Sequence, residues 1–76
     1  MTEITLYTTA GCHLCELADA ILKKMEVIIK YIEIGDNDDL VARYGTSIPV
    51  LKFTDDSELN WPFEQHDITD KILQLS

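Results

Sequence analysis

The chain has 76 residues, which is enough for one small domain spanning residues 1–76. Six Lys and Arg residues against 14 Asp and Glu residues give a formal net charge of −8. This charge excludes nucleic acid and anionic membrane surfaces as partners, because both would repel the protein. With 46% hydrophobic and 26% charged residues, the composition is that of a folded domain and not of a disordered chain.

The first half of the chain predicts a strand, a helix and a second strand. Residues 4–8 form a short run of aliphatic and Thr residues that ends at Gly11, as a strand followed by a turn does. Residues 27–34 are β-branched and nearly unbroken, which indicates a buried strand. Between them, apolar residues recur at steps of three and four along one face of an amphipathic helix, which we expect to lie in the core. These residues are Leu14, Leu17, Ala18, Ile21, Leu22 and Met25.

The second half predicts a short helix, two strands and a final helix. Asp36 is a good N-cap for the short helix, which runs through Tyr44 and stops at Gly45. Residues 50–54 and 58–61 are close enough in sequence to form an antiparallel hairpin across a polar turn. The apolar residues expected on the inner side of the final helix are Ile68, Ile72 and either Leu73 or Leu75.

The predicted order is therefore β-α-β-α-β-β-α. A helix that crosses between two strands is typical of a right-handed βαβ unit, so we expect an α/β fold with a partly parallel sheet. The first residues lack the basic and apolar regions of a signal peptide, and no apolar run approaches the roughly 20 residues that span a bilayer. We therefore expect a cytoplasmic protein, and we expect it to be a monomer.

The motif that carries chemistry is Cys12-His13-Leu14-Cys15, placed after the first strand at the start of the first helix. The start of a helix presents free N–H groups and the positive end of the helix dipole, and both stabilise a thiolate. A spacing of three brings the two sulfurs within reach of a disulfide. The first cysteine faces solvent and the second points back along the helix, so we expect Cys12 to attack and Cys15 to resolve the mixed disulfide.

Three segments, residues 6–15, 48–51 and 61–63, resemble a family of small glutaredoxin-like proteins with a thioredoxin fold, many of which carry Cys-His-Leu-Cys. The resemblance implies a four-stranded mixed sheet flanked by three helices and the activity of a thiol–disulfide oxidoreductase. It also implies that Ile48 and Pro49 form a cis-proline element beside the dithiol, with Trp61 as a further wall of the substrate groove.

The resemblance implies protein or small-molecule thiols and disulfides as partners and no bound cofactor. Glutathione or a thioredoxin-type reductant is the expected electron donor. However, Trp61-Pro62-Phe63-Glu64 stands where typical glutaredoxins carry a Gly-Gly pair that binds glutathione. Pro62 has no N–H to donate, and Glu64 repels a carboxylate. Arg43 is the remaining cation for a glutathione contact, so we expect weak glutathione binding.

Proton transfer also departs from the thioredoxin pattern, in which a buried acid lies on the first strand beneath the second cysteine. The corresponding residue here is Leu6 or Thr8, so deprotonation of Cys15 is expected to depend on water or on the leaving thiolate. His13, as an imidazolium beside Cys12, is expected to stabilise the thiolate, unless it is a solvated side chain on an exposed turn.

Two alternatives to an enzyme stay open. One is a thioredoxin-like interaction or redox-sensing module whose cysteines do nothing catalytic. The other is a metal-binding thiol site in which Cys12, Cys15, His13 and His66 are counted as ligands. His13 lies between the cysteines and would point away from their shared face, and His66 has no close partner in sequence. We therefore expect no metal.

Overall fold

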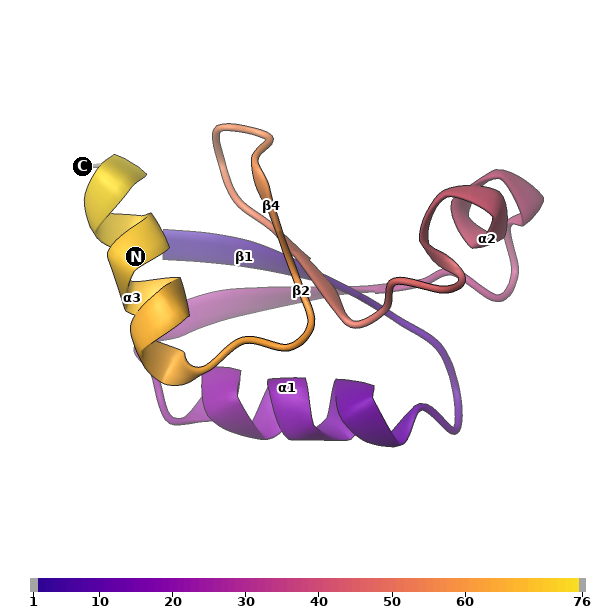
Figure 1. Ribbon diagram of the computed structural model, residues 1–76, viewed down its shortest axis with the longest axis horizontal. Coiled ribbons are helices and arrows are strands. Elements are labelled where there is room, and N and C mark those ends of the chain that lie inside the picture. Colours follow the sequence, from indigo (N-terminus) through magenta and orange to yellow (C-terminus); the bar gives the residue numbers. More distant parts are fainter. Residues whose placement is uncertain (1, 76) are drawn as a thin grey trace.

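The computed structural model describes residues 2–75, which form one four-stranded sheet and three helices (Figure 1). The order β-α-β-α-β-β-α and the α/β class are as predicted. In chain order the elements are β1 (Thr2–Thr8), α1 (His13–Lys23), β2 (Val27–Glu33), α2 (Asp38–Tyr44), β3 (Val50–Lys52), β4 (Glu58–Asn60) and α3 (Gln65–Leu75).

The sheet is mixed, with the strand order β2-β1-β3-β4. β1 pairs with β2 in parallel, and β3 pairs antiparallel with both β1 and β4, so the predicted hairpin is confirmed. Thr8 lies opposite Glu33, and Tyr7 lies opposite Val50. The ends of β1 and β2 and the start of β3 therefore meet at one edge of the sheet, which brings together the loops before α1, before α2 and after α2.

The two faces of the sheet are covered unequally. α1 and α3 cover one face, and α2 packs against the other face at a single end. There the rings of Tyr7 and Tyr44 stack with centroids 4.3 Å apart, beside Ile34 and Val50. The main core, under α1 and α3, consists of Ile4, Leu6, Ala18, Leu22, Leu51, Phe53, Phe63 and Ile68.

The prediction that residues 27–34 form a buried strand is wrong. β2 is an edge strand, and Ile28 and Tyr31 are 47% and 52% exposed. The hydrophobic run correctly indicates a strand, but it does not reveal how many helices cover that strand. Ile28 belongs to neither of the two core clusters, which agrees with α2 covering only one end of its face of the sheet.

The prediction that the whole apolar stripe of α1 lies in the core is wrong as well. α1 buries Cys15, Ala18 and Leu22, whereas Leu14 and Leu17 are each 42% exposed. The buried residues define an inner face centred between Cys15 and Ala18. Leu14 and Leu17 lie on one flank of that face, beyond the reach of the sheet.

The ends of several elements differ from the prediction by a few residues. The N-cap of α2 is Asn37 and not Asp36, because the Asn37 side-chain oxygen accepts a hydrogen bond from the Leu40 N–H at 3.1 Å. β3 stops at Lys52, since a turn begins at Phe53, whose carbonyl accepts from the Asp56 N–H. In α3, Leu75 is the residue that packs inward, and Leu73 is exposed.

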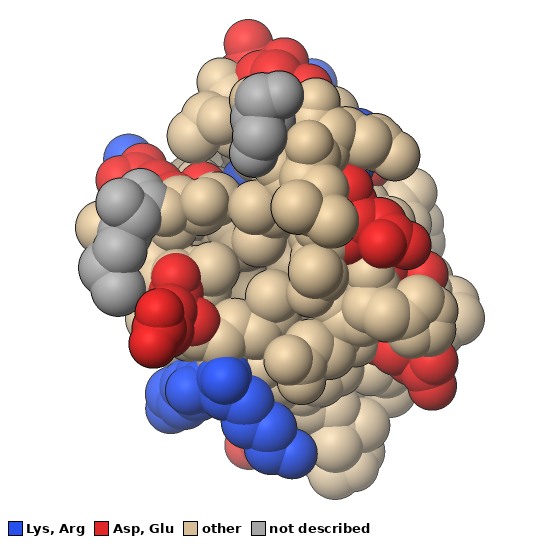
Figure 2. Space-filling model, turned by 90° about the vertical axis from the view of Figure 1, so that its left-hand side faces the viewer, with Lys and Arg blue, Asp and Glu red and all other residues tan. Residues whose placement is uncertain are grey.

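Charged side chains are spread unevenly over the surface. Figure 2 shows the end of the molecule that carries α3, with uncharged atoms at its centre, acidic side chains around them and basic ones gathered at the lower left. Residues 35–76 hold nine acidic and three basic residues, a net charge of −6 of the total −8. Within residues 2–75, no helix has the length and apolar character that crossing a membrane requires.

Because the α1 leucines are buried to different extents, we expect their replacement by Ala to lower the free energy of unfolding by different amounts. Leu22→Ala should lower the free energy of unfolding by about 2–5 kcal/mol, because it leaves a cavity at a fully buried site. Leu17→Ala, on the same helix, should lower the free energy of unfolding by about 1 kcal/mol or less. Urea unfolding of the two variants measures both values. Equal losses would contradict the placement of Leu17 on an exposed flank.

Candidate active site

Cys12 is the N-cap of α1. Its backbone is extended, with φ −81° and ψ 105°, and the helix begins at the next residue. The Cys12 sulfur accepts a hydrogen bond from the Cys15 N–H at 3.2 Å, and the Cys12 carbonyl accepts from the Glu16 N–H. Gly11, with φ 78°, makes the left-handed turn that leads into this cap. A thiolate at Cys12 would thus take the place that a Ser or Asp side chain usually occupies at an N-cap.

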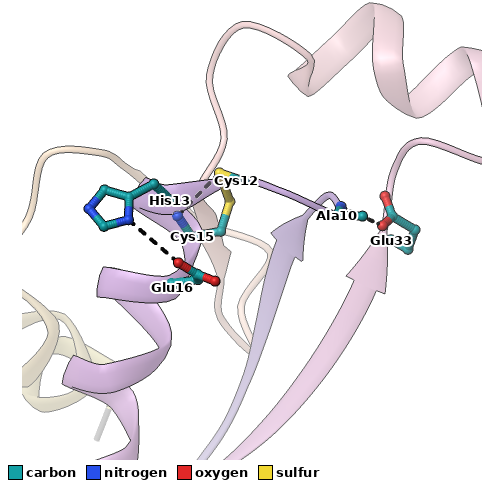
Figure 3. Close-up of a disulfide and its surroundings, with 6 residues drawn as sticks. All are labelled: Ala10, Cys12, His13, Cys15, Glu16 and Glu33. Atoms are coloured by element: carbon teal, nitrogen blue, oxygen red, sulfur yellow. Dashed lines mark hydrogen bonds and ion pairs between the residues drawn. A yellow bond between two sulfur atoms is a disulfide. The ribbon is translucent and has the colours of Figure 1, made fainter.

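Cys12 and Cys15 are joined by a disulfide, with Cα atoms 5.2 Å apart (Figure 3). The two residues differ in exposure. Cys12 is half-buried, whereas only 3% of Cys15 is exposed. Cys12 is therefore the more accessible of the two residues, and Cys15 lies behind it on the inner face of α1.

The loop that leads to Cys12 is tied to the end of β2 by one carboxylate. Glu33 accepts hydrogen bonds from the Ala10 N–H at 2.9 Å, drawn in Figure 3, and from the Gly35 N–H at 2.7 Å. The pKa of Glu33 is held below its usual value by hydrogen bonds to its carboxylate. In decreasing order of effect, the donors are the Gly35 N–H, the Thr9 hydroxyl and the Ala10 N–H. Sequence reasoning missed this residue, because an acid at the end of a strand is ordinary in sequence.

His13 faces solvent. Its imidazole points away from the disulfide in Figure 3 and lies 3.5 Å from the Glu16 carboxylate, and both side chains are exposed. His66 lies at the start of α3 between Glu64 and Asp67. Within residues 2–75, no three His, Cys, Asp or Glu side chains are grouped as ligands for a metal ion.

A pocket of about 190 Å³ opens beside the disulfide on the β2 side of α1. Both cysteines line it, together with Leu6 and Thr8, the two positions considered for a buried acid. Its carboxylates come from α1 instead, from Glu16 and Asp19. The remaining lining residues are Thr9, Gly11 and Tyr31.

Asp19 is held in place by two donors. The Tyr31 hydroxyl donates to Oδ1 at 2.5 Å, and the Lys23 ammonium lies 2.9 Å from Oδ2. Partial burial acts to raise the pKa of Asp19, but these hydrogen bonds and the Lys23 charge outweigh it and lower the pKa. Asp19 follows Cys15 by four residues, which is a helical spacing that could have revealed it in the sequence. No comparable signal marks Tyr31.

The three predicted groove residues lie together. The Ile48-Pro49 peptide bond is cis, as the resemblance implies, and Pro49 is buried. The Trp61 N–H donates to the Pro49 carbonyl at 3.3 Å. Because Val50 pairs with Tyr7, Pro49 lies at the edge of the sheet from which the loop to Cys12 departs. The Trp61-Pro62 bond is also cis, which the sequence did not predict.

Arg43 lies at the same edge of the sheet, on α2. Its guanidinium lies 5.5 Å from the centre of the Tyr44 ring. The Tyr44 hydroxyl donates to Glu58 at 2.6 Å, and this hydrogen bond, more than burial, raises the pKa of Tyr44 to about 12. The contact of Arg43 with glutathione stays a prediction.

These features define a class: a thioredoxin-like fold with two cysteines at the start of α1 and a cis proline before β3. The chain belongs to the family described as the glutaredoxin-like domain (DUF836), whose model matches residues 3–73. No curated protein matches the chain.

Solved structures agree with this assignment. The crystal structure of the structural genomics target XcR50 from X. campestris is 30% identical, with a TM-score of 0.81 over 91% of this chain and 93% of that one. The solution structure of Ne2328 from Nitrosomonas europaea is also 30% identical, with a TM-score of 0.76 over 92% of this chain and 89% of that one. Both therefore share the fold over nearly their whole length.

The lowered pKa of Glu33 predicts a pH-dependent contribution to stability. Ionised Glu33 stabilises the folded state above its unfolded pKa, near 4.5, and this contribution is lost as the pH falls through the lower folded pKa. At pH 7, Glu33→Gln should lower the urea midpoint, and the gap to the wild type should close toward pH 3. Glu26→Gln, which removes an equal charge from an exposed site just after α1, is the control. A gap that stays constant with pH would contradict this role.

Proposed function

We propose that this protein is a dithiol–disulfide oxidoreductase in which Cys12 is the nucleophile and Cys15 the resolving thiol. The observation that carries the proposal is the position of Cys12: half-buried, at the N-cap of α1, with the Cys15 N–H directed at its sulfur. A helix start that donates to a sulfur favours the thiolate over the thiol. The thiolate is the form that attacks a disulfide.

The reaction runs in two exchanges. The Cys12 thiolate forms a bond to one sulfur of the substrate disulfide, and the other substrate sulfur leaves as a thiolate. Cys15 then loses its proton to solvent in the adjoining pocket and attacks the Cys12 sulfur. The Cys12–Cys15 disulfide forms, and the second substrate sulfur leaves as a thiolate. Two electrons have passed from the dithiol to the substrate, and an external reductant must return them.

The disulfide state is compatible with this cycle. In the disulfide state both cysteines lie at the start of α1, and the Cys15 N–H points at the Cys12 sulfur. A regular helix start therefore accommodates the bonded state that the cycle requires. The buried position of Cys15 disfavours a direct bond between it and a substrate, which supports Cys12 as the first sulfur to attack.

His13 contributes through its charge. With its ring turned toward Glu16 and its side chain 80% exposed, it acts on the Cys12 thiolate only through solvent. Solvent screening makes such a contribution small. We therefore assign the stabilisation of the thiolate mainly to the backbone of α1 and give His13 a minor share.

Substrates enter along the cis-proline side, where Ile48, Pro49 and Trp61 lie. The net charge of −8 favours neutral or basic thiols and disulfides over glutathione, which is itself anionic. Pro62 offers no N–H at the position where typical glutaredoxins bind a glutathione carboxylate. We propose a thioredoxin-type reductant as the better electron donor.

Replacing each cysteine in turn tests the proposed roles. Cys12→Ser should abolish reduction of an artificial disulfide substrate, because no nucleophile remains. Cys15→Ser should still attack once and then accumulate as a mixed disulfide with the substrate, visible by intact-protein mass spectrometry. Rates are measured with both a glutathione-type and a thioredoxin-type reductant.

The wild-type protein is the deciding control in that experiment. If it is inactive with both reductants, the enzyme proposal fails, and a redox-sensing disulfide without turnover becomes the better account. If Cys15→Ser and Cys12→Ser exchange their phenotypes, the order of attack is reversed.

A further inference from the structure

An apolar groove runs along the outer flank of α1, beginning at Leu17, two residues after Cys15. Its floor and walls come from Leu17 and Ile21 of α1 and from Trp61, Pro62 and Phe63, and its volume is about 460 Å³. In Figure 1 the connection from β4 to α3 runs beside α1, and this connection forms the second wall. The groove lies on the opposite flank of α1 from the pocket that Asp19 lines.

Leu14 lies on the same flank of α1, closer to Cys12 than the groove residues are. It lies within the motif, between the two cysteines, and it is 42% exposed, as is Leu17. Residues 14, 17 and 21 recur at helical spacing and therefore share one flank of α1. Large apolar side chains left half in water beside a reactive sulfur are typical of a surface that another molecule covers.

The distance from Cys12 to the groove residues indicates what kind of molecule can occupy the groove. At about 1.5 Å per residue, Leu17 lies about 7 Å and Ile21 about 13 Å along the helix axis from Cys12. An extended chain advances about 3.4 Å per residue, so these distances correspond to two and four residues. Alternate residues of an extended chain also point to the same side. Glutathione, a tripeptide, is too short to reach Ile21 from a sulfur bonded to Cys12.

Charge supports the same occupant. Glu64 lines the groove beside the Trp61-Pro62-Phe63 wall, and the chain as a whole carries a net charge of −8. The one cation among the lining residues, Lys24, follows the last turn of α1, at the far end from Cys12. The net negative charge attracts a basic polypeptide and does not repel a neutral one, whereas it repels an anionic thiol.

We propose that the groove binds an extended segment of a partner protein that carries apolar side chains at the second and fourth residues from its target cysteine. The proposal rests on the oxidoreductase function above, because the segment is held while its cysteine exchanges with Cys12. Leu14 and Leu17 act as specificity-determining residues for that reaction. This role explains why α1 leaves two apolar side chains exposed on this flank.

Synthetic peptides carrying one cysteine as a mixed disulfide with 5-thio-2-nitrobenzoate test this proposal. When the Cys12 thiolate bonds to the peptide sulfur, the bond from that sulfur to thionitrobenzoate breaks, and thionitrobenzoate leaves as a coloured thiolate. Each peptide with Leu at the second and fourth residues from the cysteine is paired with a control peptide that has Ser at both of these residues. One pair places these residues before the cysteine, and another pair places them after it.

The reduced wild-type protein should react about fivefold or more faster with the Leu peptide of at least one pair. Leu17→Ser should lose most of that preference, because the rate with the Leu peptide falls toward the rate with the Ser peptide. Leu73→Ser is the matched control, because it removes an exposed leucine from α3, outside the groove. It should keep the preference, and thermal unfolding of both variants checks that they are folded.

Three outcomes overturn the proposal. Equal rates for the Leu and Ser peptides of both pairs would show that the groove does not bind the apolar side chains of the peptide. A preference that survives Leu17→Ser, or that Leu73→Ser removes equally, would place recognition elsewhere. By contrast, a wild-type protein that reacts with none of the peptides refutes the oxidoreductase function itself, so the two failures are distinguishable.

Discussion

The hydrogen bond from the Cys15 N–H to the Cys12 sulfur is the interaction on which the account depends. It makes Cys12 both the cap of a helix and the proposed nucleophile of the site. The surrounding structure maintains that arrangement. Gly11 provides the turn, Glu33 ties the loop to β2, and Ala18 and Leu22 anchor α1 to the sheet. A chain of 76 residues thus uses its one long crossover helix both for its core and for its chemistry.

The two flanks of α1 give the site two different sides. On the side of β2, Asp19 and Tyr31 border a polar pocket that gives buried Cys15 a route to solvent. On the side of the β4–α3 connection, Leu17 and Trp61 border an apolar groove. We propose that the dithiol between these two surfaces releases its proton to solvent on one side and that its substrate binds on the other.

The order of elements, the mixed sheet and the position of the dithiol could all be predicted, because periodicity, turn residues and a motif at a helix start are local signals. The exposure of Ile28 and Leu17 could not, since burial depends on which helices cover a face, and the sequence does not specify how far α2 extends over the sheet. Glu33 and Tyr31 were missed for a related reason. Their partners, Ala10 and Asp19, lie 23 and 12 residues away, and nothing in the sequence links them.

The most direct test is the pH dependence of alkylation of the reduced protein by iodoacetamide, followed by mass mapping of the modified cysteine. The account predicts that Cys12 is modified first and titrates well below the value of about 8.5 for a free cysteine, with Cys15 protected. Replacing His13 with Gln should change that profile little. A Cys12 that titrates near 8.5, or a Cys15 that reacts equally fast, would contradict the account.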